Sequence, residues 1–378
     1  MDTPGTIFAL GGVRLTGYGL FTALGLLAGY MLARRQAERG HIRQSALEKV
    51  CLFTMLYAMI LGRAVYVVSN VGFFGEYPSA ILRIWEGGIS TMGAFAGALL
   101  GTRQGAGRRG FRRALDMLMP GLLLTLAVSR LGELTCWQGR GMIVGGGIFP
   151  LTISNSQGAR CLAVCVYEAV AALGLMAYAL RRENRPAGCV GFTCIMLLSL
   201  AQVPLESMRS DDFLAVGFVK VDQLIAMIMA VTMIVMFLRG CLRAHKSSIL
   251  DFIALGVAVI MVVMCVVEEF RIDGSANPAL NYFMLFIYVS VMAMCGMYLR
   301  MGWRAAPEAH SHIKARSTAP TYANSRRTST YYPDMRESAA SAPARNRNKQ
   351  AEAQAPRYSN KVDAYRRANV QSSRRERG

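Results

Sequence analysis

The chain has 378 residues, and 53% of them are hydrophobic. Its formal net charge is nevertheless +19, with 42 Lys and Arg against 23 Asp and Glu. Apolar and basic residues must therefore occupy separate regions, which excludes an ordinary soluble domain and is typical of a chain that crosses a membrane several times.

Nine apolar segments follow one another along the chain, and most approach the roughly 20 helical residues that span a bilayer core. In chain order they are 17–33, 50–68, 89–101, 114–128, 161–180, 188–203, 221–238, 249–267 and 279–299. We therefore predict an all-α polytopic membrane protein with a seven-helix core. The last two segments have no ionisable residue in their interiors and are joined by the short acidic loop 268–274, so we expect an appended two-helix hairpin that packs against the core or a partner.

The charges along the chain predict its orientation in the membrane. No Lys or Arg precedes the first segment within residues 1–12, and no small-residue cleavage site follows it, so we expect a retained first helix and not a removable signal peptide. Lys and Arg gather after alternate segments, at 34–43, 103–113, 181–185 and 239–246, and again in the tail. By the positive-inside rule those regions are cytoplasmic, and the N-terminus lies outside.

The composition changes after Leu299. Residues 301–378 contain sixteen Lys and Arg against six Asp and Glu, with almost no aliphatic run, so they cannot bury enough apolar surface to fold alone. We predict a disordered, basic, cytoplasmic tail that is attracted to the anionic lipids of the inner leaflet, and we do not expect nucleic acid to be its partner. The predicted domains are the transmembrane core 1–246, the extra hairpin 247–300 and the tail 301–378.

Few strongly polar side chains lie within or at the outer ends of the first seven segments. They are Tyr18, Arg63, Arg83, Glu86, Arg130, Glu133, Gln138, Arg140, Gln202, Glu206, Arg209 and Lys220. A charge buried in a membrane protein is costly unless it is paired, so each of these needs a partner or a polar cavity. Arginines outnumber carboxylates in this set, and arginine suits bidentate phosphate binding, so the pattern indicates a phospholipid headgroup as the ligand.

Two pairs in this set have helical spacing. Arg130 with Glu133, and Glu206 with Arg209, lie at i and i+3, which is compatible with simple intrahelical ion pairs as well as with a shared site. Glycines that include Gly88 and Gly132 lie nearby in the predicted topology and would let the backbone approach a ligand closely.

No histidine is available to such a site. His41 and His245 follow cytoplasmic ends of segments, and the other two histidines lie in the tail. The remaining proton acceptors are Glu86, Glu133 and Glu206, and we select Glu206 as the base. Neither a metal site nor an organic cofactor is predicted, since most cysteines lie within apolar runs, where a free thiol behaves as a small hydrophobe.

A charged, glycine-rich insert, residues 83–93, runs directly into an apolar segment. Lipid tolerates irregular backbone and ionisable groups only where protein or a water-filled cavity shields them, so the insert marks a site. Its stretch Trp85-Glu86-Gly87-Gly88-Ile89-Ser90 resembles the aromatic-acidic-Gly-Gly-Met-Ser signature of the bacterial prolipoprotein diacylglyceryl transferases.

Further motifs in the same order carry this resemblance over roughly residues 7–238. They are Tyr18-Gly19, Gly62-Arg63-Ala64-Val65-Tyr66-Val67, Asp116 with Pro120, Arg130-Leu131-Gly132, Tyr167-Glu168, and Glu206 with Arg209 and Gln223. The resemblance implies transfer of a diacylglyceryl group from phosphatidylglycerol to the lipobox cysteine of a preprolipoprotein signal peptide, at the outer face of the bacterial inner membrane. It implies Tyr18, Arg130 and Glu206 as catalytic residues.

The resemblance also implies a set of residues that bind the substrates. They are Arg130, Arg209, Gly88, Gly132, Arg63, Gln202 and Glu133. Arg130 and Arg209 would bind or neutralise phosphate, and fixed positive charge would stabilise an anionic leaving group.

The chain departs from the family pattern at four places. Met92 stands where the family has His, Glu133 where it has Asn, Gln202 where it has Arg, and Leu162-Ala163-Val164-Cys165 where it has His-Pro-Ser-Gln. Two alternatives to an active transferase follow. One is a catalytically impaired paralogue that acts as a lipid-binding or membrane assembly protein, and the other is a transporter that uses the same charged cavity.

Overall fold

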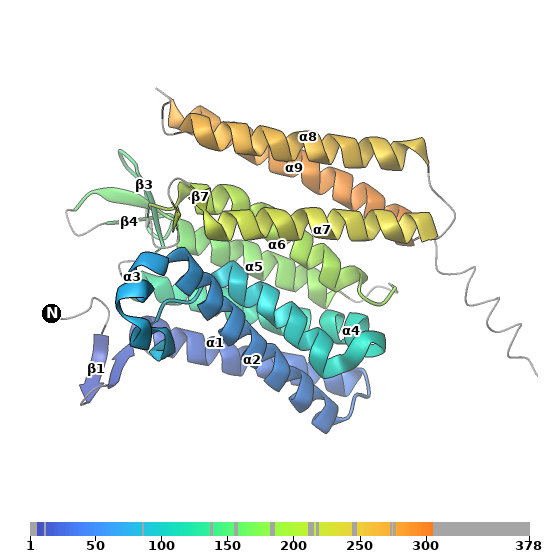
Figure 1. Cartoon of the computed structure of the whole chain (residues 1–378), viewed down its shortest axis with the longest axis horizontal. Helices are drawn as coiled ribbons and strands as arrows, with labels where there is room; N and C mark the ends of the chain where they lie inside the picture. The colour runs from blue at the N-terminus through green and yellow to red at the C-terminus, as the bar shows by residue number, and fades with distance from the viewer. Residues whose placement is uncertain are drawn as a thin grey trace, which may run out of the picture. The chain divides into compact units, whose positions relative to one another are not determined.

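The computed structural model describes residues 6–10, 13–84, 87–136, 139–154, 158–181, 186–210, 215–216, 219–243, 248–272, 274 and 277–304. Within these residues the fold is predominantly helical, as predicted (Figure 1). The predicted disordered tail lies almost wholly outside the described residues, as do Trp85, Glu86 and Gln138.

The helices begin and end close to the predicted segments. They are α1 (Gly17–Arg39), α2 (Gln44–Ser69), α3 (Val71–Glu76), α4 (Thr91–Gly132), α5 (Val164–Leu180), α6 (Cys189–Met208), α7 (Val221–Arg243), α8 (Ile249–Ile272) and α9 (Pro278–Arg304), with short 3-10 turns η1 (Pro78–Leu82) and η3 (Glu133–Thr135). Of the described helices, six (α2, α4 and α6 to α9) are long and apolar enough to cross a membrane, and α5 is a shorter apolar helix. The chain is therefore a multi-pass membrane protein.

Helix α4 doubles back on itself at Gly107. This glycine has φ +68° and ψ 169°, a conformation that costs glycine little and would strain other residues. The two halves of α4 run antiparallel, since Arg130 near its end donates a hydrogen bond to Thr91 at its start (3.0 Å). The two segments predicted at 89–101 and 114–128 are these halves, and the basic stretch 103–113, expected as a loop, is largely helical around the turn.

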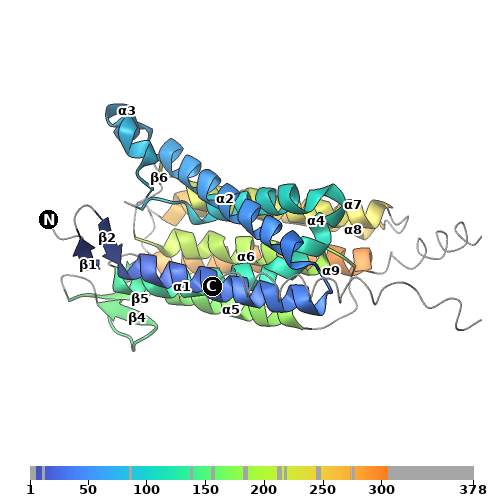
Figure 2. The same cartoon turned by 90° about the horizontal axis from the view of Figure 1, so that it is seen from below.

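Helix α4 is the centre of the first half of the bundle, where it contacts α1, α2 and α5 (Figures 1 and 2). Its second half approaches α1 at Gly121, where a Cβ would lie 2.4 Å from the carbonyl oxygen of Gly29. Such close backbone contact between helices is typical of membrane proteins. In the second half of the bundle, α9 packs on both α6 and α7, and α8 packs mainly on α9.

The appended hairpin therefore packs on the bundle, and both of its helices extend beyond the predicted apolar segments. The stretch expected as an acidic loop from residue 268 forms the last turn of α8, because Glu269 is held there by hydrogen bonds from Ser207 Oγ (3.0 and 2.9 Å) and Gln223 Nε2 (3.0 Å). Helix α9 continues to Arg304, past the predicted boundary at residue 300.

Three small antiparallel sheets were not predicted. Strands β1 (Thr6–Leu10) and β2 (Val13–Thr16) form one, β6 (Ala215–Val216) and β7 (Val219–Lys220) another, and β3 (Arg140–Ile143), β5 (Arg160–Ala163) and β4 (Thr152–Ser154) lie in that order in the third. In the third sheet Arg140 pairs with Ala163 and Ile153 with Cys161. Because β5 takes residues 161–163, α5 begins at Val164, three residues later than predicted.

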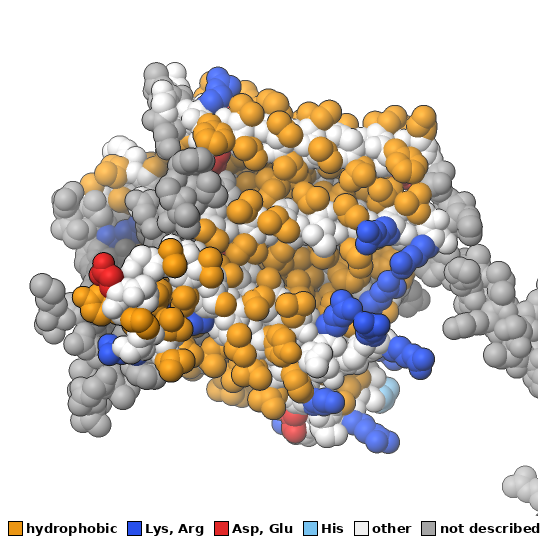
Figure 3. Space-filling view, in the orientation of Figure 1, with side chains coloured by type: hydrophobic (Ala, Val, Ile, Leu, Met, Phe, Trp, Pro, Cys, Tyr) orange, Lys and Arg blue, Asp and Glu red, His pale blue; other side chains and the backbone are white. Residues whose placement is uncertain are grey.

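The strands lie together at one end of the bundle, which we call the strand end (Figure 1). Figure 3 shows hydrophobic side chains over the middle of the visible face and most of its Lys and Arg side chains at the opposite end, which we call the basic end. An apolar band between polar ends is what a bilayer requires of a membrane protein's surface.

Candidate functional site

Six polar side chains from three helices and a turn meet at the strand end. We call Arg130, Glu133, Glu168, Gln202, Glu206 and Arg209 the arginine–glutamate cluster. Five of these side chains are buried, and that of Arg209 is 10% exposed. The buried five are Arg130, Glu133, Glu168, Gln202 and Glu206. The predicted site residues on α4 and α6 are thus brought together, although more than seventy positions separate them in the sequence.

Arg130 is fully engaged within this cluster. Its Nη1 pairs with Glu133 Oε1 in a short contact, its Nε lies 2.9 Å from Glu168 Oε2, and its Nη2 donates to Thr91 Oγ1 at 3.0 Å. The i, i+3 ion pair expected between Arg130 and Glu133 is therefore formed. Two carboxylates and one hydroxyl oxygen thus surround this guanidinium, and the ion pairs offset a charge that would otherwise be costly to bury.

Arg209 completes a four-membered ring of charges. Its Nη2 lies 3.3 Å from Glu133 Oε2 and its Nη1 lies 3.3 Å from Glu168 Oε2. Glu133 and Glu168 therefore each contact both arginines, so the two carboxylates bridge the two guanidiniums. Arg209 is the C-cap of α6, and its backbone bridges to Gly141 of β3, which fixes where its side chain begins.

Gln202 joins Glu206 to this ring. Its Nε2 donates to Glu168 Oε1 (2.5 Å) and to Glu206 Oε2 (3.2 Å). Glu206 and Gln202 are one turn apart on α6 and share a face of that helix. Glu206 thus lies at the edge of the cluster, held by an amide, while the other two glutamates are held by guanidiniums.

Lys220, one of the polar candidates from the sequence, stabilises the end of α6. Its Nζ donates to the carbonyl oxygens of Glu206 (2.9 Å), Ser207 (3.3 Å) and Arg209 (2.6 Å). A cation at these final carbonyls satisfies the orphan acceptors of α6 and opposes the negative end of its dipole. Lys220 therefore positions the turn that carries Glu206 and Arg209.

The start of α4 links the cluster to α7. Ser90 caps α4 by accepting a hydrogen bond from Gly93 N (2.8 Å), and its hydroxyl makes a short hydrogen bond to Asp222. Asp222 also accepts from Thr91 N (3.1 Å). A carboxylate at a helix N-terminus is favourable, and Thr91 in turn receives a hydrogen bond from Arg130.

Tyr18 and Gly132 lie at the same end. Tyr18, in the first turn of α1, is close enough to interact electrostatically with Glu133, Arg130 and Arg209. A Cβ on Gly132 would lie 2.6 Å from Phe21 Cβ and 3.4 Å from Tyr18 Cα, so Gly132 sets the close approach of α4 to α1. Tyr18, Arg130 and Arg209 therefore lie near one another at the strand end, and Gln202 links Glu206 to them. Their shared role in a substrate site stays a prediction.

Arg63 organises the glycine-rich insert. Its guanidinium donates to the carbonyl oxygens of Ala80 (2.7 Å), Ile81 (3.1 Å), Arg83 (3.4 Å), Gly87 (2.6 Å) and Gly88 (3.0 Å). Gly88 has φ +81°, and a Cβ there would lie 2.4 Å from the Tyr66 ring. The hydrogen bonds of Arg63 thus go to backbone carbonyls and its guanidinium also lies over the Tyr66 and Phe74 rings, while its role in substrate binding stays a prediction.

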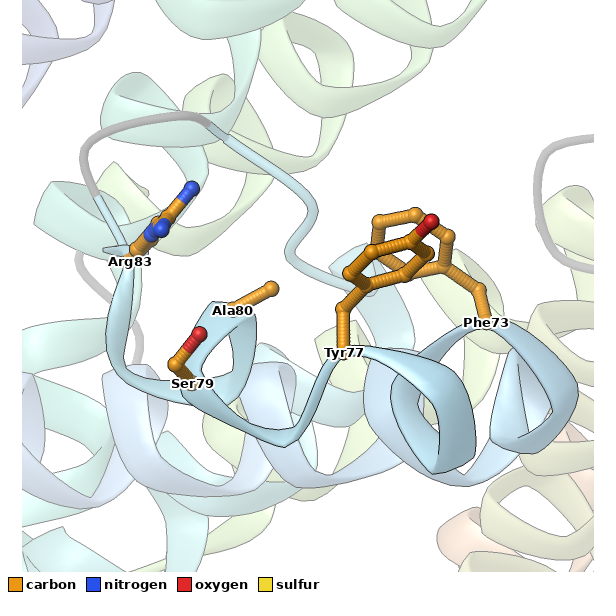
Figure 4. A pocket seen from close by; sticks show the side chains of 5 residues that line it. All are labelled: Phe73, Tyr77, Ser79, Ala80 and Arg83. Carbon is orange, nitrogen blue, oxygen red and sulfur yellow. The ribbon is translucent and has the colours of Figure 1, made fainter.

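A small open pocket of about 190 Å³ lies beside this insert, lined by Phe73, Tyr77, Ser79, Ala80 and Arg83 (Figure 4). The two aromatic rings stand together on one side of it and Arg83 reaches over the other.

Two acidic residues at this end escaped the list of polar candidates. Glu168 is the central bridge between the arginines, and Asp222 anchors the start of α4. Asp222 lies in the first turn of α7 and Glu168 is the fifth residue of α5, so each is an ionisable residue in an apolar helix, a signal that was present in the sequence. Met92, by contrast, is completely buried in the hydrophobic core.

The cluster contains more carboxylates than guanidiniums. Glu133, Glu168 and Glu206 face Arg130 and Arg209, and Glu133 takes up donors from both arginines. An incoming phosphate would seek these same donors. Among the described residues no group of three or more His, Cys, Asp and Glu is placed to hold a metal ion.

The comparisons with known proteins agree on one family. The family model described as prolipoprotein diacylglyceryl transferase matches residues 5–239. The chain is similar to the phosphatidylglycerol–prolipoprotein diacylglyceryl transferase of Bacillus velezensis, with 26% identity over 253 residues, 64% of this chain and 93% of that one. The same enzyme of Bacillus licheniformis is 26% identical (59% and 87% covered), and that of Staphylococcus carnosus is 24% identical (61% and 88% covered). The match includes the whole arginine–glutamate cluster and ends before α8.

Proposed function

This chain belongs to the prolipoprotein diacylglyceryl transferase family, and we propose that it transfers a diacylglyceryl group from phosphatidylglycerol to the lipobox cysteine of a prolipoprotein. The observation that carries this proposal is the pair Arg130 and Arg209, brought together by their shared partner Glu168 at one end of a membrane-spanning bundle. The names of the relatives favour an enzyme over the non-catalytic and transporter alternatives.

The reaction explains why such a pair is useful. The cysteine sulfur attacks the glyceryl carbon that carries the phosphate ester, a carbon–sulfur bond forms, and the carbon–oxygen bond to phosphate breaks. The departing oxygen keeps the electron pair, and the product is glycerol phosphate. Two guanidiniums aimed at that phosphate stabilise the charge that develops on it, and their effect is large because water is excluded from the site.

The thiol proton needs an acceptor, and we propose Glu206 for this role. Glu133 and Glu168 are held by both arginines, whereas the Glu206 carboxylate accepts a hydrogen bond from the neutral amide of Gln202 (3.2 Å). A carboxylate that is less tightly paired is a stronger base than one between two guanidiniums. Tyr18 would be a further polar contact to the substrate, since it approaches the cluster from α1.

Glu133 occupies a hydrogen-bond donor on each of the two arginines. Its two oxygens contact a donor on each arginine, so donor lipid can engage Arg130 and Arg209 through those nitrogens only when Glu133 yields them. We propose that Glu133 competes with the lipid phosphate. Gln202, which lies one turn before Glu206, would contribute an amide to the same binding site.

We also propose where the protein resides. The family reaction and the distribution of Lys and Arg support a location in the bacterial inner membrane, with the strand end and the N-terminus outside and the basic end in the cytoplasm. The tail that follows α9 would then lie beside anionic inner-leaflet lipids.

Complementation tests this proposal. The chain is expressed in cells depleted of their own transferase, and the diacylglyceryl modification of a reporter lipoprotein is followed by its gel mobility and by incorporation of labelled phosphatidylglycerol. We expect the wild type to restore modification and Arg130→Ala at equal membrane abundance to fail. Absence of modification by correctly inserted wild-type protein would refute the proposal.

A further inference from the structure

One arginine outside the family match is buried without a hydrogen-bonding partner. Arg300, near the end of α9, is only 4% exposed, and its Nε and Nη2 atoms are shielded from solvent and have no hydrogen-bond acceptor. Its guanidinium carbon lies 5.6 Å from the centre of the Tyr178 ring on α5, which covers one face of the charged group.

Such an arrangement is costly as it stands. A cation–π contact offsets only part of the hydration free energy that a guanidinium loses on burial. The N–H donors in the plane of the guanidinium still require acceptors. Among described residues, the salt bridges include none to Arg300. The geometry therefore leaves a planar, double N–H donor whose natural complement is an oxyanion.

A second arginine, the exposed Arg112 of α4, contacts an aromatic ring one turn further along α9. Trp303 follows Arg300 by three residues and packs against Phe192 (6.2 Å between ring centres), Phe237 (5.7 Å) and Gly240. The guanidinium of Arg112, from the second half of α4, lies 5.9 Å from the centre of the Trp303 ring. Helices α4, α5, α6, α7 and α9 thus meet here, with two arginines held on aromatic rings.

Two carboxylates at this end, Asp116 and Asp251, already accept hydrogen bonds from backbone N–H groups. Asp116, one turn after Arg112, accepts hydrogen bonds from Gly188 N (2.6 Å) and Gly191 N (2.7 Å). Asp251, at the start of α8, accepts from Ser248 N (2.8 Å). Most Lys and Arg side chains of the visible face lie at this end of the molecule (Figure 3). The local positive charge therefore favours binding of an anionic ligand.

We propose that Arg300 is the anchor of a binding site for the phosphate of an anionic phospholipid, between the ends of α5 and α9. A lipid fits better than a free anion because the site lies at the end of membrane-spanning helices and carries the Tyr and Trp residues that are enriched at membrane interfaces. Tyr298 (40% exposed) and Met301 (58%), on either side of Arg300 in the sequence, offer outward-facing surface for acyl chains. The phosphate would reach the guanidinium by displacing the partly exposed Tyr178 ring.

This site is separate from the arginine–glutamate cluster, which lies at the strand end. It needs no transferase activity, and only its assignment to the cytoplasmic leaflet rests on the orientation under the proposed function. A lipid bound at this site would contact both α5 and α9 and would thereby stabilise the packing of the appended hairpin on the core.

Native mass spectrometry of the full chain in detergent tests the proposal. Phosphatidylserine is titrated as the anionic probe, phosphatidylcholine as the zwitterionic probe and inorganic phosphate as the free anion. We expect the wild type to retain one phosphatidylserine that Arg300→Met binds about tenfold more weakly or worse, the loss expected for one charge-assisted hydrogen bond.

Arg243→Gln is the matched control, because it removes the same charge from an exposed position at the same end. It should retain the lipid as the wild type does. Arg300→Lys, which keeps the charge but lacks the planar fork, should weaken retention if Arg300→Met does not fold. Equal retention by all variants, equal retention of phosphatidylcholine, or occupation by inorganic phosphate without lipid would each overturn the proposal.

Discussion

Replacing Glu133 by Gln removes a negative charge from between the two arginines with almost no change in size. Glu133 contacts Arg130 through one oxygen and Arg209 through the other, the latter at 3.3 Å. If Glu133 competes with the donor lipid, binding of phosphate must first replace these contacts. We therefore expect Glu133→Gln to bind phosphatidylglycerol more tightly and to lower KM for this lipid.

The magnitude follows from the contacts. A hydrogen bond between charged groups contributes ~1.5–3 kcal/mol, so relief of one such contact should lower KM by about tenfold or more. The same substitution weakens folding by a smaller amount, because Arg130 keeps Glu168 (2.9 Å) and Thr91 (3.0 Å) as partners. The stability of the variant should therefore fall while its affinity for the donor rises.

Glu168→Gln is the matched control, since it makes the identical chemical change on the other bridging carboxylate. Glu168 also accepts from Gln202, and it lies in an apolar helix, so its loss should reduce both stability and activity. The assay is initial-rate transfer from labelled phosphatidylglycerol to a lipobox peptide, at several lipid concentrations, with purified protein. If Glu133→Gln raises KM as Glu168→Gln does, Glu133 is a counter-ion that the site requires, and the competition argument is refuted.

Three further changes test other parts of the structure. Arg209→Lys should lower kcat/KM by about tenfold to a hundredfold, because an ammonium cannot span both carboxylates and a phosphate as a guanidinium does; unchanged kinetics would remove Arg209 from the site. Glu269→Gln should lower the free energy of unfolding by ~1.5 kcal/mol, while Val267→Ala on the same helix, at a residue 43% exposed, should change it by less than ~1 kcal/mol. Chemical denaturation measures the free energy of unfolding of both variants. Equal losses would show that Glu269 does not link α8 to the core. Gly88→Ala should lower stability by ~1–3 kcal/mol, since the new Cβ would meet the Tyr66 ring at a positive φ; a thermal midpoint equal to that of the wild type would contradict this.

The transmembrane architecture was readable from the sequence because each helix is encoded locally. Runs of apolar residues long enough for a bilayer predict helices without any knowledge of their partners, and all nine segments lie largely in helices. The turn within α4 was also implied, since the basic stretch 103–113 cannot lie in hydrocarbon. What the periodicity could not reveal is that this turn needs a single left-handed glycine, Gly107, with helix on both sides.

The arginines of the site and the pairing of Arg130 with Glu133 were predicted for the same reason, but the shared partner Glu168 was not. Arg130 and Arg209 are conspicuous because they stand beside apolar segments, whereas the pairing of each with Glu168 depends on how α4, α5 and α6 pack. No spacing rule in one sequence gives that packing. The small sheets escaped prediction likewise, because β3 and β5 pair across about twenty residues and contain too few residues for an alternating pattern.

The hairpin changes how the family match is to be understood. The match ends at residue 239, yet Glu269 of α8 binds Ser207 and Gln223, which lie within it. Ser207 is adjacent to Glu206, and Gln223 is adjacent to Asp222, so the hairpin stabilises the two turns that carry the proposed base and the anchor of α4. A segment outside the family's boundaries therefore supports the site within them, and a truncation at residue 239 would leave these turns without a carboxylate that now holds them together.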